Sequence, residues 1–167
     1  MAGLDWLGQL PAAGWALCLT FVRGKTEGEV LAGFGAQPTP SSGPAAGYGP
    51  QAPSARVGRS GEWLVAVEEN IPPQGTRPEV LRRVSAGTTA VSVYNDIGKS
   101  NDQFACAADG EVVAAVTTFV PPRWSGTDPA WAWPVASVFG LTEDGAETDL
   151  TRWRRCSHWP RWHSGCR

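Results

Sequence analysis

Apolar residues fill the run at positions 15–22 so completely that both faces of an extended segment would be hydrophobic. Trp15, Leu17, Leu19 and Phe21 would point one way. The intervening residues, Ala16, Cys18, Thr20 and Val22, would point the other way. A strand that is apolar on both faces is typical of the interior of a sheet that is covered on both sides. The run therefore predicts a central strand.

Further alternating runs predict the rest of the sheet. Residues 56–60 and 62–70 flank Gly61 and predict either a strand pair or one bulged strand. The stretch 88–94 is rich in β-branched and aromatic residues, which favour strands. Two more runs, 103–108 and 111–119, flank Asp109-Gly110, the dipeptide most typical of a two-residue type I′ hairpin turn. A simple register across this turn places Cys106 opposite Val113.

Two segments share a helix-start pattern, in which Thr is followed three residues later by Glu. Thr26 with Glu29, and Thr76 with Glu79, have the spacing of a capping box. The apolar residues that follow fall on one helical face in each copy. Gly87 suits the end of the second helix, since glycine enters the left-handed region without strain. A third, short helix is predicted between residues 128 and 140, bent or shortened by a proline at 134.

Together these elements predict a single α+β domain, with a mainly antiparallel sheet of about five strands and two or three helices on one face. Residues 1–36 would supply a strand–helix unit, and residues 56–141 the main sheet and the other helices. Between them, residues 37–55 are rich in Pro, Gly and Ser and predict a flexible loop. Residues 142–167 are expected to be a disordered or out-of-frame tail.

Several strings along the chain resemble an uncharacterised family of actinobacterial proteins, a domain of unknown function. The strings are CLTFVRG, EVLAGFGA, RPEVLRRVSAGTTAVSVY, DQFACAADGEVV and PPRWSGTDP, in that order, and the resemblance covers roughly residues 5–141. It implies a small cytosolic α+β domain. None of the strings is a catalytic signature, so the resemblance assigns no functional residue.

The charge distribution limits the classes of partner. Residues 1–150 hold 9 Lys and Arg and all 16 Asp and Glu, a net charge of −7, whereas the last 17 residues hold 5 Arg and no acid. An acidic body argues against a nucleic-acid surface, which needs clustered basic side chains. No run approaches transmembrane length and no signal peptide is visible, so we expect a cytoplasmic protein that binds neither nucleic acid nor membrane.

The absence of histidine from residues 1–150 narrows the chemistry further. It excludes Ser-His-Asp and Cys-His catalysis there, together with the usual zinc and iron ligand sets. Cys18 and Cys106 lie among apolar neighbours, which favours buried, unreactive thiols. No phosphate-binding or nucleophile-elbow string is present. We therefore expect no cofactor.

Two groups of residues remain as candidate sites. Charged and polar side chains near strand ends could line a cleft for a polar ligand, or could form an ordinary solvated rim: Glu69, Arg77, Tyr94 and Asp96. Aromatic residues in a proline-rich region could form a surface for a protein partner: Trp124, Trp131 and Trp133. The favoured hypothesis is a non-enzymatic regulatory or protein-interaction module. The alternative is a small enzyme or ligand-binding protein with a carboxylate and arginine cleft near Glu69 and Arg77.

The tail, residues 151–167, is made almost wholly of Arg, Trp, Cys, Ser, His, Pro and Gly, without helical or strand periodicity. That composition is typical of GC-rich DNA translated out of frame. A weaker alternative is a zinc site made by Cys156, His158, His163 and Cys166. Its spacing is poor, because Cys156 and His158 lie only two positions apart.

Overall fold

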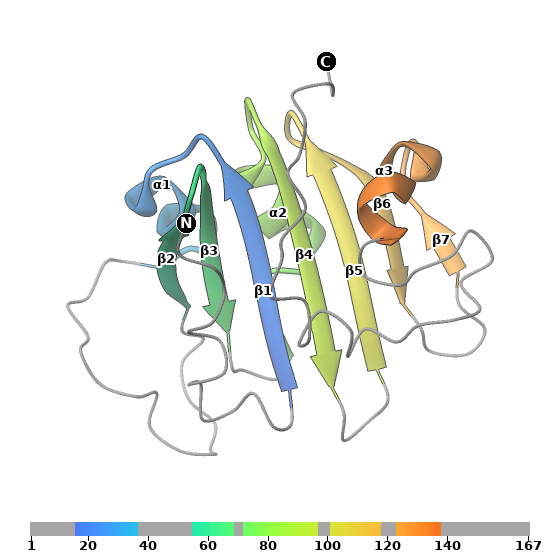
Figure 1. Cartoon of the computed structure of the whole chain (residues 1–167), viewed down its shortest axis with the longest axis horizontal. Helices are drawn as coiled ribbons and strands as arrows, with labels where there is room; N and C mark the ends of the chain where they lie inside the picture. The colour runs from blue at the N-terminus through green and yellow to red at the C-terminus, as the bar shows by residue number, and fades with distance from the viewer. Residues whose placement is uncertain (1–15, 37–54, 69–71, 97–100, 118–122, 138–167) are drawn as a thin grey trace.

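The computed structural model describes residues 16–36, 55–68, 72–96, 101–117 and 123–137, which form one antiparallel sheet flanked by helices (Figure 1). The seven strands are β1 (Ala16–Arg23), β2 (Arg56–Ser60), β3 (Trp63–Glu68), β4 (Thr89–Asp96), β5 (Asn101–Ala108), β6 (Glu111–Thr117) and β7 (Arg123–Ser125). Their order across the sheet is β2-β3-β1-β4-β5-β6-β7. The α+β class is confirmed, but the expected strand number is wrong. The run at 56–68 makes a true hairpin, and the sequence patterns did not predict β7.

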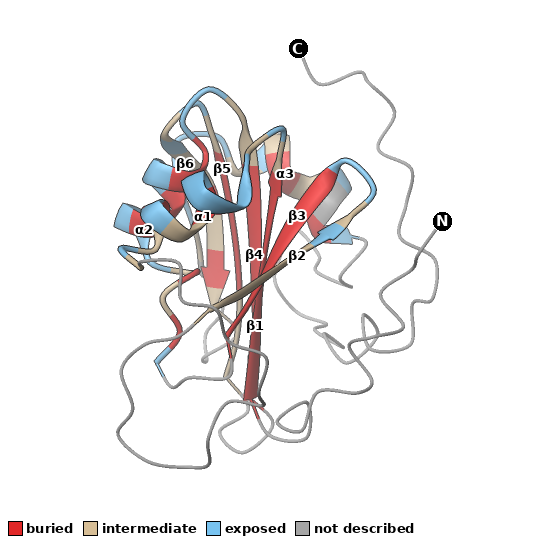
Figure 2. Cartoon of the chain, turned by 90° about the vertical axis from the view of Figure 1, so that its left-hand side faces the viewer, coloured by how far each residue is buried: buried red, intermediate tan, exposed pale blue. Residues whose placement is uncertain are grey.

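Two of the three helices lie on one face of this sheet, and the third lies on the other face. They are α1 (Glu27–Gly33), α2 (Pro78–Val84) and α3 (Pro129–Ala136). Apolar side chains of α1 and α2 pack in one core cluster with Val22, Leu64 and Ala90. Ala132 and Ala136 of α3 belong to a different cluster, which is built on the opposite side chains of the same strands. Figure 2 shows α1 and α2 on one side of the strands and α3 on the other. Helices α1 and α2 therefore pack in one core cluster, and α3 packs in the cluster on the other face.

Strand β1 lies in the interior of the sheet, as its sequence predicted. It pairs with β3 on one side and with β4 on the other. Leu17, Leu19 and Phe21 are buried in the cluster that includes α3, whereas Val22 is buried in the cluster that includes α1 and α2. Because both sets of side chains are removed from water, an apolar run on both faces is the pattern that this position requires.

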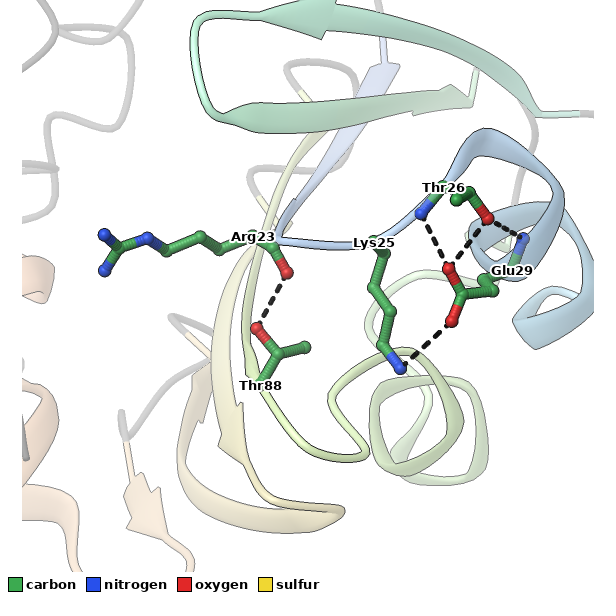
Figure 3. Close-up of polar contacts among 5 residues, drawn as sticks. All are labelled: Arg23, Lys25, Thr26, Glu29 and Thr88. Atoms are coloured by element: carbon green, nitrogen blue, oxygen red, sulfur yellow. Dashed lines mark hydrogen bonds and ion pairs between the residues drawn. The ribbon is translucent and has the colours of Figure 1, made fainter.

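The first helix starts as its sequence predicted, and the second does not. Thr26 is the N-cap of α1: its hydroxyl accepts the Glu29 N–H, and Glu29 Oε2 accepts the Thr26 N–H at 2.8 Å (Figure 3). In α2 the N-cap is Arg77, which makes no side-chain capping bond. Pro78 explains the difference. Proline prefers the first helical position, and this moves the helix start one residue beyond Thr76.

The Asp109-Gly110 turn is confirmed, and its register is not the simple one. Both residues have positive φ, 50° and 81°, as a type I′ turn requires. Cys106 pairs with Ala114 and not with Val113, because a β-bulge interrupts the ladder next to Cys106. The carbonyl of Val113 accepts a hydrogen bond from the Asp128 N–H at 2.9 Å. The bulge thus turns one strand carbonyl toward the segment that leads into α3.

Candidate functional site

On the face that carries α1 and α2, cross-strand neighbours change from apolar to polar along the strands. The register places these residues in three successive rows across β3, β1 and β4: Leu64, Val22 and Ala90; then Ala66, Thr20 and Ser92; then Glu68, Cys18 and Tyr94. The first row packs under α1 and α2. We call Cys18, Thr20, Glu68 and Ser92 the polar cluster. All four are buried.

Glu68 is the charged member of the polar cluster, and it is only 1% exposed. Its Oε1 accepts the backbone N–H of Gln74 at 2.9 Å, and its Oε2 accepts that of Gly75 at 2.7 Å. Burial raises the pKa of the Glu68 carboxyl, while the two N–H groups and the positive charge of Arg77 act in the opposite direction. The carboxylate therefore fixes the backbone of the chain just before α2.

The other three members are joined by their side chains. The Thr20 and Ser92 hydroxyl oxygens lie 3.1 Å apart, and Cys18 Sγ lies 3.4 Å from Ser92 Oγ. Burial raises the pKa of the Cys18 thiol, and the nearby Glu68 carboxylate raises it further. A thiol that stays protonated is a poor nucleophile. The predicted burial of Cys18 and Cys106 is confirmed.

Residues 72–77, which we call the Gly75 segment, lie directly on the polar cluster. A Cβ atom added at Gly75 would stand 2.1 Å from Thr20 Oγ1, 2.9 Å from Glu68 Oε2 and 3.1 Å from Ser92 Oγ. Real Cβ contacts are longer than this, so the backbone approaches as closely as it does only because residue 75 is glycine. The Gly75 segment therefore covers the polar cluster on the side that faces away from the sheet.

The structure brings together some of the charged candidates and separates others. Tyr94 and Asp96 are both buried on β4, and the Tyr94 hydroxyl donates to Asp96 Oδ2 at 3.0 Å. Burial, and then this bond to a carboxylate, raise the pKa of Tyr94. Arg77 is exposed, at the N-cap of α2. Glu69 lies outside the described residues.

Sequence reasoning missed Glu68 as the central carboxylate. In β3 it lies on the face opposite Trp63, Val65 and Val67, and the Gly75 segment covers that face. One sequence signal was available, since Glu68 follows five apolar residues in the same strand. A carboxylate at the end of a fully buried strand needs hydrogen-bond donors, and the adjacent loop is the nearest source of them.

Two of the three candidate tryptophans pack against the core cluster beneath α3. Trp124 of β7 and Trp131 of α3 are half-buried there. The Trp124 ring meets Phe104 edge-on, with centroids 6.2 Å apart and planes at 66°. Trp133 is also half-buried but is not part of that cluster. Its Nε1 is removed from solvent and has no hydrogen-bond partner in the described part of the chain.

Metal binding finds no support among the residues that the structure describes, which contain no group of three or more Cys, His, Asp or Glu side chains placed to hold an ion. Cys156, His158, His163 and Cys166 lie outside those residues. Within the same described ranges, no helix is long and apolar enough to cross a membrane.

Comparison with protein families matches residues 51–156 to a family of unknown function. The chain belongs to that family, DUF6461. The matched range starts before β2 and extends beyond α3, whereas β1 and α1 precede it, although β1 lies in the same sheet. No curated protein and no solved structure gives a significant match. Membership confirms the expected resemblance to an uncharacterised family of unknown function, although the match begins at residue 51, after the strings CLTFVRG and EVLAGFGA. The family description assigns no activity.

Proposed function

We propose that this chain is a non-enzymatic, cytoplasmic module that binds a protein partner through the surface formed by Trp124, Trp131 and Trp133. The observation that carries the proposal is the setting of Trp124 and Trp131. Each is packed against the core on one side and still partly exposed on the other. Rings held rigid in this way lose little conformational entropy on binding, which is why tryptophan is enriched among the residues that dominate interfaces.

The chemistry of α3 indicates what kind of partner would fit. The helix, PAWAWPVA, has no charged residue, so docking an apolar surface on it would desolvate no charged group of the helix. A matching partner would present an apolar, uncharged face to this helix. The charged backbone of a nucleic acid does not offer such a face.

The polar cluster supports the non-enzymatic part of the proposal. Its thiol, carboxylate and hydroxyl groups are buried under the Gly75 segment, and the pKa of its thiol is raised. A group that acts on a substrate has to reach it. The structure shows these side chains hydrogen-bonded to one another or to the backbone.

Site-specific photocrosslinking in the native host tests this function. A photoreactive amino acid at position 133 is expected to capture one defined protein, and the same residue at Arg82, which is exposed on the helix across the sheet, is not. Trp124→Ala in the position-133 protein should reduce the yield at least ten-fold while the chain stays folded by circular dichroism. Equal capture from positions 133 and 82 would reject the aromatic surface.

The alternative, a ligand site or small enzyme near Glu69 and Arg77, is favoured by one observation. Arg77 lies close enough to Glu68 to oppose the rise in the pKa of that carboxyl. A carboxylate and a guanidinium at a strand end could hold a polar ligand. A thermal-shift screen with charged metabolites, compared between the wild type and Arg77→Ala, distinguishes the two functions, since a partner module predicts no hit that Arg77 controls.

A further inference from the structure

The Gly75 segment leads into α2, and its hydrogen bonds to the sheet end on a carboxylate. Glu68 binds the N–H groups of Gln74 and Gly75. By contrast, the helix that follows is held by the apolar side chains Val80, Leu81 and Val84. The segment and the helix therefore rest on the sheet through different forces.

A buried carboxylate makes the polar attachment weaker than its hydrogen bonds suggest. Removing a charge from water is costly, and only part of that cost is recovered from two backbone N–H groups. If the segment lifts, Glu68 regains water, and the freed N–H groups regain water as well. Lifting α2 would instead expose three buried apolar side chains to water, which is unfavourable. Local opening should therefore begin at the segment and stop at the helix.

We propose that the Gly75 segment is a cover that opens locally while the sheet stays folded, and that opening presents the polar cluster to solvent. In the closed state the cluster is out of reach, since its four side chains are buried. In the open state the domain offers a carboxylate, a thiol and two hydroxyls together on one face of the sheet. The segment would control access to these groups independently of the aromatic surface at α3.

Two native thiols on opposite faces of the sheet provide the test. Cys18 belongs to the polar cluster, and Cys106 is buried in the cluster that includes α3. With Cys156 and Cys166 replaced by serine, the other two of the 4 cysteines can be followed by alkylation and peptide mass spectrometry. Cys18 should be labelled at least ten-fold faster than Cys106. The labelling rate of Cys18 should depend only weakly on urea concentration. The labelling rate of Cys106 should rise steeply with urea, in parallel with the fraction of globally unfolded protein.

Amide exchange in Glu68→Gln tests the role of the carboxylate directly. A glutamine amide presents one acceptor oxygen and one NH2 group, so it cannot accept both N–H groups as the carboxylate does. Exchange in residues 72–77 should accelerate at least ten-fold, with residues 80–84 of α2 unchanged. Glu62→Gln removes a carboxylate that is exposed on the same hairpin and serves as the matched control. Equal labelling of Cys18 and Cys106 in the chain with Glu68 intact, or unchanged exchange in Glu68→Gln, would overturn the proposal.

Discussion

The backbone nitrogen of Gly75 donates a hydrogen bond to Oε2 of Glu68 over 2.7 Å, which joins the last buried residue of β3 to the chain that starts α2. This contact allows no side chain at position 75, since a Cβ there would lie 2.1 Å from Thr20 Oγ1. Gly75 is the most constrained position in the candidate site.

Gly75→Ala is expected to destabilise the domain by about 2 kcal/mol or more, because the methyl group forces the segment away from the polar cluster. Urea denaturation followed by circular dichroism measures the change. Gly28→Ala is the matched control: it lies in α1, a Cβ there meets nothing within 4 Å, and alanine favours a helix by roughly 0.5–1 kcal/mol. If both substitutions had the same effect, close packing at Gly75 would not be the cause.

The two threonines of the repeated pattern T-x-x-E give a second comparison. Thr26→Ala should cost about 1 kcal/mol of unfolding free energy, because it removes the side-chain cap of α1. Thr76→Ala should change the free energy much less, since Thr76 does not cap α2. Both values come from the same denaturation experiment. A larger loss of unfolding free energy in Thr76→Ala than in Thr26→Ala would show that Thr76 caps α2, as the T-x-x-E pattern implies, and that Arg77 is not the N-cap.

These two positions also show how far local sequence patterns can predict the fold. The spacing is identical at Thr26 and Thr76, but only the second copy has a proline two positions after the threonine. The preference of Pro78 for the first helical position overrides the capping box. Between β5 and β6, the Asp109-Gly110 turn is local and was predictable. The bulge beside Cys106 occurs together with a hydrogen bond between β6 and the segment before α3. Because that contact joins residues distant in sequence, no short sequence pattern predicted the bulge.

The candidate site was less predictable for a related reason. Alternation assigned Glu68 to its face of β3, but it does not say what covers that face. Burial of Glu68 depends on its row across the sheet, with Cys18 and Tyr94, and on a segment that returns over it. These are contacts between residues distant in sequence. The strand run at 15–22 succeeded because its prediction needed no partner, only two apolar faces.

The hairpin turn gives a third prediction. Gly110→Val should destabilise by about 1 kcal/mol or more, since φ at this position is +81° and a β-branched residue resists positive φ. The Gly110 N–H of this turn also donates to the hydroxyl of Ser85, the C-cap residue of α2, at 3.2 Å, so strain there should also disturb the end of that helix. Thermal unfolding measures the effect. An unchanged melting temperature would be inconsistent with this turn geometry.

Glu68 gives a pH dependence whose sign follows from its environment. Burial raises its folded-state pKa above the unfolded value of about 4.3, so the folded state holds this proton to higher pH. The stabilising contribution is complete below the unfolded pKa and is lost as pH rises through the folded pKa. The titratable groups that act on it are Cys18, on the neighbouring strand, and Arg77, whose positive charge opposes the rise.

Subtracting the unfolding free energy of Glu68→Gln from that of the wild type, at each pH between 4.5 and 8, isolates this contribution. The difference should fall steadily as pH rises, because glutamine does not titrate. Other carboxylates act in both proteins and cancel. A difference that grows with pH would mean that the N–H groups of Gln74 and Gly75 outweigh desolvation, and that the folded-state pKa lies below its usual value.

The last prediction concerns the C-terminal segment, where the family match overlaps the region of unusual composition. The family match extends to residue 156, whereas the unusual composition begins near residue 151. We expect a chain ending at residue 150 to melt within a few degrees of the full chain. It should also remain soluble at higher concentration, because the removed residues include three tryptophans in 17 positions.

A second truncation, ending at residue 156, shows where the fold stops. If the family match marks a structural boundary, the chain ending at 156 should be more stable than the chain ending at 150. If the tail lies outside the fold, the two should melt together. Zinc analysis of the full chain and of Cys156→Ser completes the test, since stoichiometric zinc that is lost on substitution would make Cys156, His158, His163 and Cys166 a metal site and the tail a structural element.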